Sequence, residues 1–466
     1  MKRTDAADKE AEAPGAQAAQ PPSAAPRASR WRRARDNFWP SWTTRDMGFL
    51  LAARVCMSAT RALAGVLTPI YLALIGYNGF ALGALFAVVA LASAAMTALI
   101  GILSDRVGRK IFIVVIPWLA AVAALVFAVS RVGALIFIFA ALGSFGRGAG
   151  AGAGTVGPYQ PAEQALLADA VSARHRNSLF GRIAFASSLG ALIGSGPLTV
   201  LPGILGRFGL PVTHGLAPYR FSFVVLAVMA LLAGILAIPV RETRTVRDPV
   251  PAAAPISGRR WRRPRLRLSA RTRPILYRLW ATNTVNGLAV GFFGPFITYW
   301  FFRRYGAGAD VVGPLFAVIN LAAMVSNLVA ARFAAWLGVV RAITVSRALQ
   351  AVLIVPMVLA PTFWLAGAFY LLRMLAQRMG LPLRQSYVMG VVAPEERGSV
   401  AALSNLPSQA ASAVSPTAAG YLFDHVALAL PFEISAVLQA INTVMFFVFF
   451  RAVRPPEESE RRRSAP

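Results

Sequence analysis

Long apolar stretches separated by short polar or basic segments recur along the whole chain. Each stretch holds about 20 residues, which is the length of α-helix that crosses the hydrocarbon core of a bilayer. The apolar residues lack the strict alternation of a barrel strand, and only helices or closed barrels satisfy their backbone groups in lipid. The pattern predicts twelve helices, at roughly residues 47–75, 79–102, 111–130, 134–158, 181–206, 220–240, 277–302, 310–333, 342–360, 363–392, 400–424 and 430–450.

A basic segment rich in Pro and Ala divides the predicted helices into two groups of six. It spans residues 241–276 and carries eleven arginines. We therefore expect five parts in this order: a disordered or interfacial N-terminal segment (1–46), a six-helix bundle (47–240), the basic linker (241–276), a second six-helix bundle (277–451) and a short tail (452–466).

The two groups of helices share sequence. "GALFAVVALA" at 83–92 matches "GPLFAVINLA" at 313–322 in seven of ten positions, and the same offset aligns Gly108 with Gly338. Because one offset holds for two separate features, duplication explains the similarity better than chance. The expected fold is an all-α integral membrane protein of twelve transmembrane helices, arranged as two pseudo-symmetric six-helix bundles. Duplicated halves of this kind are a recurrent transporter architecture, with a substrate site between them near the bilayer midplane.

Composition and charge agree with a membrane protein. The chain is 57% hydrophobic and 14% charged, whereas a soluble domain has roughly 25% charged residues. The net charge of +28 does not indicate nucleic-acid binding, because the arginines gather in the linker and the two terminal segments, as cytoplasmic flanks do. We expect a multi-pass protein of the cytoplasmic (inner) membrane, monomeric, with both termini cytoplasmic and its basic segments at anionic headgroups.

Three motifs resemble those of the major facilitator superfamily. "GILSDRVGRK", Gly101 to Lys110, resembles the loop signature between the second and third spans of that superfamily. "RGAGAGAG", which begins at Arg147, resembles its fourth-span motif, and "PEERGSVAALSN" at 394–405 resembles its usual entry into span eleven. The resemblance covers about residues 46–453. It implies a bacterial twelve-span secondary transporter that carries a small-molecule substrate by alternating access.

The loop signature implies a conformational latch. By resemblance, Asp105 holds the two halves together in one state, and Asp169 at the end of span four pairs with Arg109. A carboxylate in this place can face the positive N-terminal end of a neighbouring helix. The alternative is that these charges only anchor helix ends at the headgroups. The predicted latch consists of Gly101, Asp105, Arg106, Gly108, Arg109, Lys110 and Asp169.

Two departures from the superfamily patterns limit the assignment. The second-half counterpart of the loop signature reads "ARFAAWLGVVR", with Ala335 where Asp105 stands in the first half. Span five carries "GRIAFASSLGALIGSGP", in which Ser195 displaces the proline expected in the fifth-span motif of drug/proton antiporters. The second departure argues against an antiporter.

Arginines lie within three of the four helices that line the cavity in this superfamily. A charge in the membrane costs at least about 2.5–3.5 kcal/mol, so it faces a wet cavity or a partner. Few carboxylates oppose these arginines, and guanidinium groups grip carboxylates or phosphates, so we expect an anionic or acidic substrate. The candidate cavity residues are Arg61, Arg147, Asn283, Asn286, Asn320, Arg373, Gln377 and Arg384.

Each of these residues has a structural alternative. Arg147 can hydrogen-bond to carbonyl groups of a neighbouring helix without touching cargo. Arg54 and Arg384 can lie shallow enough to extend their side chains to the headgroups. The asparagines can form ordinary hydrogen bonds between helices.

Other functions remain as alternatives. Efflux of drugs or metabolites by proton antiport would need a titratable group on the path, for which Glu163 and Glu433 are the candidates. A membrane enzyme has little support, because the three histidines lie in predicted loops and no metal-binding or catalytic motif is present. A non-transporting receptor would require only the cavity. The Gly-rich run lacks the Gly-Lys-Ser/Thr end of a phosphate-binding loop, so we expect no nucleotide, and no cofactor or metal.

Overall fold

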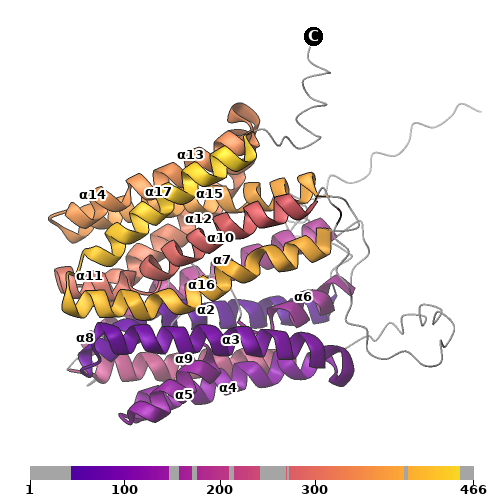
Figure 1. The fold of residues 1–466 in the computed structure, drawn as a ribbon. Coiled ribbons are helices and arrows are strands. Elements are labelled where there is room, and N and C mark those ends of the chain that lie inside the picture. Colours follow the sequence, from indigo (N-terminus) through magenta and orange to yellow (C-terminus); the bar gives the residue numbers. More distant parts are fainter. Residues whose placement is uncertain are drawn as a thin grey trace, which may run out of the picture. The chain divides into compact units, whose positions relative to one another are not determined.

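The computed structural model describes residues 44–145, 157–169, 176–208, 215–241, 269, 272–392 and 397–451, and every regular element in these ranges is a helix (Figure 1). The N-terminal half of the chain contributes α2 (Arg45–Leu74), α3 (Gly79–Val107), α4 (Arg109–Val129), α5 (Gly133–Gly143), α6 (Gln160–Asp169), α7 (Arg176–Ser195), α8 (Pro197–Arg207) and α9 (Ala217–Ala237). The C-terminal half contributes α10 (Thr272–Phe293), α11 (Ile297–Tyr305), α12 (Ala309–Leu337), α13 (Val339–Val352), α14 (Ile354–Leu359), α15 (Phe363–Val391), α16 (Arg397–His425) and α17 (Leu430–Phe450).

The described helices agree with the twelve predicted spans, three of which consist of two helices each: α7 with α8, α10 with α11, and α13 with α14. Of the fourth predicted span, 134–158, α5 covers the first part, residues 146–156 lie outside the described chain, and α6 follows from Gln160. Local sequence accounts for two of the interruptions. Pro197 occupies the first turn of α8, where its missing N–H costs nothing, and Gly294 and Pro295 separate α10 from α11. The sequence pattern predicted the spans but not their interruptions.

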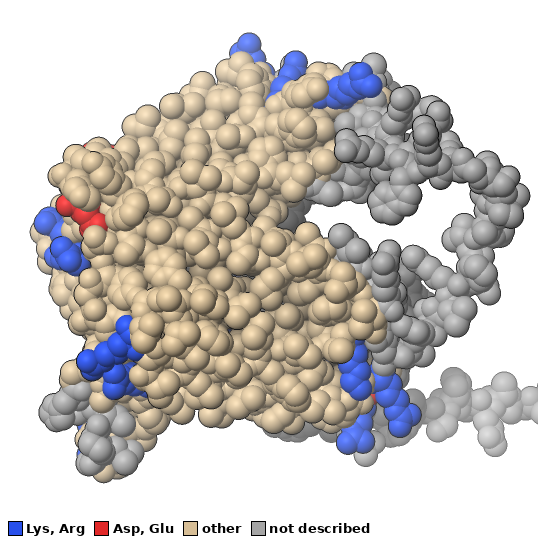
Figure 2. All heavy atoms as spheres, turned by 60° about the horizontal axis from the view of Figure 1, so that its bottom comes forward, with Lys and Arg blue, Asp and Glu red and all other residues tan. Residues whose placement is uncertain are grey.

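The helices have the length and surface of membrane spans. Eight stretches of the described chain are long and apolar enough to cross a membrane, and Gly133–Gly143 and Ala309–Met324 are shorter apolar helices. α15 and α16 complete the twelve. Large apolar side chains such as Val129 and Val414 are 77% and 68% exposed. Figure 2 shows a face with uncharged side chains across its middle and the Lys and Arg of the described residues around its margin, as expected of a surface facing lipid.

The duplication found in the sequence is repeated in the helix bounds. α3 and α12 each hold 29 residues and start 230 positions apart, and α4 and α13 start at the same offset. The single residues that join these helices, Gly108 and Gly338, have φ of 110° and 81°. L-residues with side chains rarely adopt such angles, so glycine allows both one-residue turns.

The two halves also share their packing. In the first half α2 packs against α7 and α9, and α4 packs against α9 and α5. In the second half the corresponding helices pair in the same way: α10 with α16 and α17, and α13 with α17 and α15. The chain therefore consists of two pseudo-symmetric six-helix bundles.

The two bundles meet through two pairs of helices that the pseudo-symmetry also relates, α3 with α16 and α12 with α7. Glycines permit these close approaches. A Cβ at Gly83 would lie 2.2 Å from the carbonyl oxygen of Pro416. A Cβ at Gly313, the repeat-related position, would lie 2.5 Å from the carbonyl oxygen of Ser195, the last residue of α7. Small residues at both contacts allow the helix backbones to touch.

Replacing Gly83 by leucine is expected to push α3 away from α16 and to lower the free energy of unfolding by about 1–3 kcal/mol, the usual cost of overpacking. The matched control is Gly203→Leu, because no heavy atom of the described residues lies within 4 Å of a Cβ at that position. Unfolding in mixed micelles measures both variants. Equal stabilities of the two would contradict a tight contact at Gly83.

Candidate functional site

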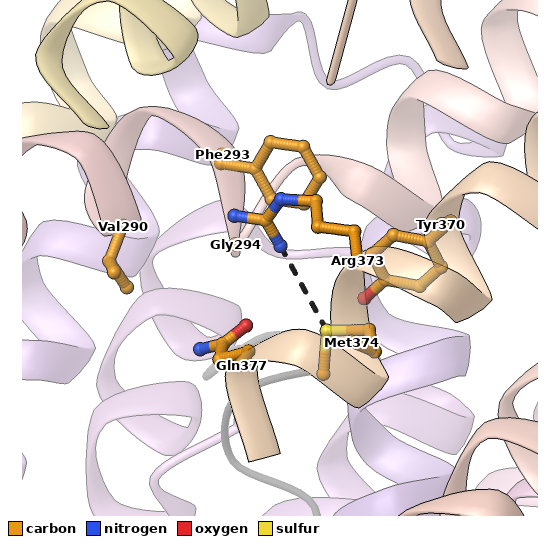
Figure 3. Close-up of a pocket in the computed structure, with 7 residues that line it drawn as sticks. All are labelled: Val290, Phe293, Gly294, Tyr370, Arg373, Met374 and Gln377. Atoms are coloured by element: carbon orange, nitrogen blue, oxygen red, sulfur yellow. Dashed lines mark hydrogen bonds between the residues drawn. The ribbon is translucent and has the colours of Figure 1, made fainter. Parts of the chain in front are cut away.

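A small pocket lies between α10 and α15 in the C-terminal half (Figure 3). The side chains around it come from the last two turns of α10 and from one face of α15. The helical spacing of three and four residues places Tyr370, Arg373 and Gln377 together on that face. Its lining residues are Val290, Phe293, Gly294, Tyr370, Arg373, Met374 and Gln377.

Arg373 is the only charged residue that lines this pocket, and its side chain is 5% exposed. Its guanidinium carbon lies 3.7 Å from the centroid of the Phe293 ring, and Nη1 donates a weak hydrogen bond to Sδ of Met374 at 3.9 Å. Nε has no hydrogen-bond partner among the described residues. An aromatic face and a thioether stabilise a cation only partly, so the guanidinium keeps donor capacity for a ligand.

The sequence around the pocket contains almost no acid to neutralise Arg373. Asp310 is the only Asp or Glu between residues 272 and 392, and it lies in the first turn of α12. An aromatic wall, formed by Phe293 stacked on Tyr370 at 5.9 Å, surrounds the cation instead. Apolar walls with a few convergent polar groups are typical of small-molecule sites. The chemistry of this one suits a carboxylate or another oxyanion.

Arg54 in the N-terminal half has a carboxylate partner. The side chain of Arg54 forms a buried ion pair with Glu163 of α6, and its Nε donates to Oγ of Ser187 on α7 at 2.5 Å. Arg54 is 3% exposed and Glu163 2%. The interpretation of Arg54 as a side chain that reaches the headgroups is therefore wrong, because it points into the bundle. Glu163, a predicted proton-coupling candidate, is the other member of this ion pair.

Arg61 lies two turns further along α2 than Arg54, near the end of α5. Its Nη2 donates to the carbonyl oxygen of Ser144 at 3.1 Å, and Ser144 has a left-handed φ of 53°. A Cβ at Gly157 would lie 2.9 Å from Nη1 of Arg61. The guanidinium thus sits between α5 and the residues before α6. Arg147, another predicted cavity residue, lies outside the described residues.

The other predicted cavity residues hydrogen-bond to neighbouring helices. Within the C-terminal half, Asn283 donates to the carbonyl oxygen of Ser404 at 2.5 Å. Asn320 donates to Oγ of Ser195 at 3.3 Å and so bonds across the two halves. Of the predicted cavity residues, the structure brings Arg373 and Gln377 into one pocket.

The residues of the predicted latch lie at the end of the helices where α9 stops and α10 starts, here called the linker end. Asp105 and Arg106 lie in the last turn of α3, Gly101 one turn earlier, and Arg109 and Lys110 begin α4 after Gly108; Asp169 ends α6. Glu433 lies in the first turn of α17, at the opposite end. The latch itself stays a prediction.

Asp424, near the end of α16, is a contact residue that the sequence analysis missed. Its two carboxylate oxygens accept hydrogen bonds from the backbone N–H groups of Gly79 at 2.8 Å and Phe80 at 2.7 Å, in the first turn of α3. A carboxylate at a helix N-terminus satisfies free N–H groups and complements the helix dipole. This contact joins the two halves at the end opposite the linker end. The signal was an acid at the end of a span, the same signal as Asp105.

Replacing Asp424 by alanine is expected to weaken the contact between α16 and α3 by about 0.5–2 kcal/mol, the usual cost of losing a carboxylate cap. A cysteine at Leu82, which is fully buried in α3, reports the opening. With Cys56, the only cysteine, changed to serine, maleimide labelling at position 82 should be faster in the Asp424→Ala protein. Unchanged labelling would mean that the carboxylate does not hold this end closed.

Arg347 on α13 is a second residue that the sequence analysis overlooked. Its side chain is 6% exposed, and Nη1 donates to Oδ1 of Asn442 at 2.7 Å. Asn442 in turn donates to Oδ1 of Asn286 at 3.3 Å, so three helices share the network. The rule that singled out Arg373, a permanent charge inside a predicted span, identifies Arg347 as well.

Twelve membrane-spanning helices in two repeated halves, with an arginine-containing pocket inside one half, are the architecture of a membrane transporter. The chain belongs to the Major Facilitator Superfamily, whose family model matches residues 50–374 and 279–466. Members of this family are transporters and not enzymes, which removes the enzyme alternative. No curated protein sequence matches the chain.

Solved structures with the same fold transport different substrates. A bacterial homologue of the human lysosomal transporter Spinster, inward-facing and occupied, is 15% identical, with 87% of this chain and 96% of that chain covered and a TM-score of 0.64. The nucleoside transporter NupG is 12% identical, with 88% and 100% covered and a TM-score of 0.64. The human organic anion transporter MFSD10 (TETRAN) is 18% identical, with 87% and 100% covered and a TM-score of 0.52. At these identities the likeness shows the fold alone.

Proposed function

We propose that this protein carries a small organic anion across the membrane by alternating access of its two halves. The observation that carries the proposal is the buried Arg373 guanidinium, which lines a pocket, contacts a ring and a thioether, and keeps Nε unpartnered among the described residues. A carboxylate that enters the pocket would supply the missing acceptor and offset the charge. Gln377 offers an amide on the same wall for orientation.

The choice of an anion rests on the pocket and not on the fold. Proteins of similar fold include transporters of nucleosides, of xylose with protons and of organic anions, so fold does not select a substrate. The two halves differ in how their buried arginines are neutralised, and this difference selects an anion. The Arg54 charge is neutralised by Glu163, whereas α10 and α15, the helices that line the Arg373 pocket, contain no Asp or Glu.

The proposed moving parts are the six-helix bundles 47–240 and 277–451, joined by the basic linker 241–276. At the end opposite the linker end, the two halves are in contact through the Asp424 cap and through the close approach at Gly83. Rocking of the halves would break these contacts and form the latch around Asp105. The arginine-rich linker supports a cytoplasmic location for the linker end and both termini, beside anionic headgroups of the inner membrane. We also propose that the protein is a monomer.

Thermal unfolding of the purified protein tests the proposal. Benzoate and citrate are the anionic probes, benzamide is the neutral isostere of benzoate, and tetraphenylphosphonium is the cationic probe. A ligand that binds only the folded state at one hundred times its Kd adds about 2.7 kcal/mol of stability. We expect anions to raise Tm and benzamide to leave it unchanged. Stabilisation by tetraphenylphosphonium alone would overturn the proposal and favour cation efflux.

A further inference from the structure

Two aromatic rings form one side of the Arg373 pocket. Phe293 is the last residue of α10 and Tyr370 lies on α15, and their ring centroids are 5.9 Å apart with an interplanar angle of 25°. Figure 3 shows both rings beside the Arg373 side chain. Two further rings pack against them at steep angles, Phe432 at 5.0 Å from Phe293 and Phe316 at 5.6 Å from Tyr370. Because these two do not line the pocket, the surrounding core holds the aromatic wall in place for a ligand.

The pocket offers a ligand one cation, held over one of these rings. The guanidinium carbon of Arg373 lies 3.7 Å from the centroid of the Phe293 ring, and Nε has no hydrogen-bond partner among the described residues. The donors of a guanidinium lie in its own plane, so a carboxylate that binds two of them lies in that plane as well. Arg384, another predicted cavity residue on α15, donates instead to Oδ1 of Asn405 at 2.8 Å and does not line the pocket. The pocket therefore suits one planar anionic group.

Gly294 leaves open space next to Phe293. A Cβ at this position would lie 3.1 Å from the carbonyl oxygen of Val290 and 3.9 Å from Cγ1 of the same residue. Apart from the chain neighbours, no other heavy atom of the described chain lies within 4 Å of that Cβ. Since Gly294 and Val290 both line the pocket, a side chain at position 294 would take up part of it. The glycine therefore keeps room for a flat group beside the aromatic wall.

From these features we infer that the substrate is an aryl carboxylate, in which the carboxylate is attached directly to an aromatic ring. Conjugation keeps such a carboxylate close to the plane of its ring, so a carboxylate bound to Arg373 carries the ring into the space beside Phe293. There the ring meets Phe293 and Tyr370 in offset-stacked or edge-to-face contacts, which stabilise aromatic pairs beyond the burial of apolar area. The inference rests on the proposed function and names the substrate class of the same site.

Benzoate and cyclohexanecarboxylate, which have equal numbers of carbon atoms and equal charge, test the inference. The saturated ring is the more apolar of the two, so a pocket that used apolar burial alone would prefer cyclohexanecarboxylate. We expect benzoate to bind about fivefold more tightly, which corresponds to about 1 kcal/mol for an aromatic pair. Calorimetry on the full chain measures both Kd values.

Three outcomes would contradict one proposal or the other. A benzoate advantage below about twofold, or a preference for the saturated acid, would overturn the inference, because the aromatic wall would then contribute less than a typical aromatic pair. Binding of citrate but of neither ring acid would also overturn the inference alone. Binding of none of the three anions would overturn the proposed function itself.

Substitution of Phe293 locates the ring contact. Phe293→Leu should reduce the advantage of benzoate to within about twofold. The ratio of the two Kd values is the readout, because Phe293 also contacts Arg373 and its loss affects both acids alike. The control is Phe363→Leu: Phe363 is a buried ring of α15 that pairs with Phe301 at 5.1 Å and does not line the pocket. An unchanged ratio in Phe293→Leu would overturn the inference.

Gly294→Ala decides the question if Phe293→Leu does not fold. Gly294 is not among the glycines with positive φ, so alanine fits the backbone, and the added methyl group takes up space in the pocket. We expect this variant to weaken benzoate binding at least about fivefold more than acetate binding, as overpacking at a ring site would. Equal losses for benzoate and acetate would overturn the inference, because the space beside Gly294 would then not hold the ring.

Discussion

Replacing Glu163 by leucine is expected to lower the free energy of unfolding by about 3–5 kcal/mol, the cost of leaving a buried charge without its partner. The partner is Arg54, whose side chain is 3% exposed and which bonds otherwise to Ser187. The ion pair joins the first and fourth spans of the N-terminal half. SDS titration in mixed micelles measures the loss.

The double variant Arg54→Met with Glu163→Met separates the charge from the packing. A buried ion pair repays little more than its own desolvation, so an apolar pair of similar volume is often neutral or stabilising. We expect the double variant to recover most of the stability that either single variant loses. If the double variant lost as much stability as the two single variants together, the result would contradict an ion pair between these residues.

Replacing Arg373 by glutamine is expected to weaken anion binding by at least about 30-fold, or about 2 kcal/mol, while the protein still inserts and folds. The glutamine keeps a donor but loses the charge. Arg373→Lys keeps the charge but loses the planar fork, so it should restore binding only in part. The readout is Kd for benzoate, alongside the melting temperature without ligand.

The control for Arg373 is Arg304→Gln. Arg304 lies in the last turn of α11, is exposed and is not among the residues that line the pocket. It should bind benzoate as the parent does. Arg373→Gln could instead reduce expression or folding while the folded fraction still binds benzoate as the parent does. That result would mean that Arg373 stabilises the fold and does not bind the anion.

The sequence was sufficient for the fold because lipid imposes a simple rule. Spans must be apolar and helical, and so the twelve helices and their duplication follow from hydropathy and from one offset of 230 positions. The one-residue turn at Gly108 followed from the loop signature at residues 101–110. The interruptions within spans did not follow, and neither did the end of α5. Ser144 ends α5 in a left-handed conformation, and its carbonyl oxygen accepts a hydrogen bond from Arg61, a contact that depends on tertiary packing.

The sequence predicted the site only in part. Arg373 and Gln377 share a pocket as their spacing on one helix indicated. The contacts of Arg54 with Glu163 and of Asp424 with Gly79 join residues 109 and 345 positions apart, and composition gives no register for such pairs. Arg347 could have been predicted, because it is a permanent charge inside a predicted span, as Arg373 is.

Charge displacement on solid-supported membranes shows whether the protein carries an anion through the Arg373 pocket. Proteoliposomes are exposed to a concentration jump of benzoate, of benzamide or of tetraphenylphosphonium, and the current reports the sign of the charge that enters the protein. We expect a current for benzoate with the sign of moving negative charge, none for benzamide, and none for benzoate in Arg373→Gln. A current for tetraphenylphosphonium alone, unaffected by Arg373→Gln, would contradict the proposal.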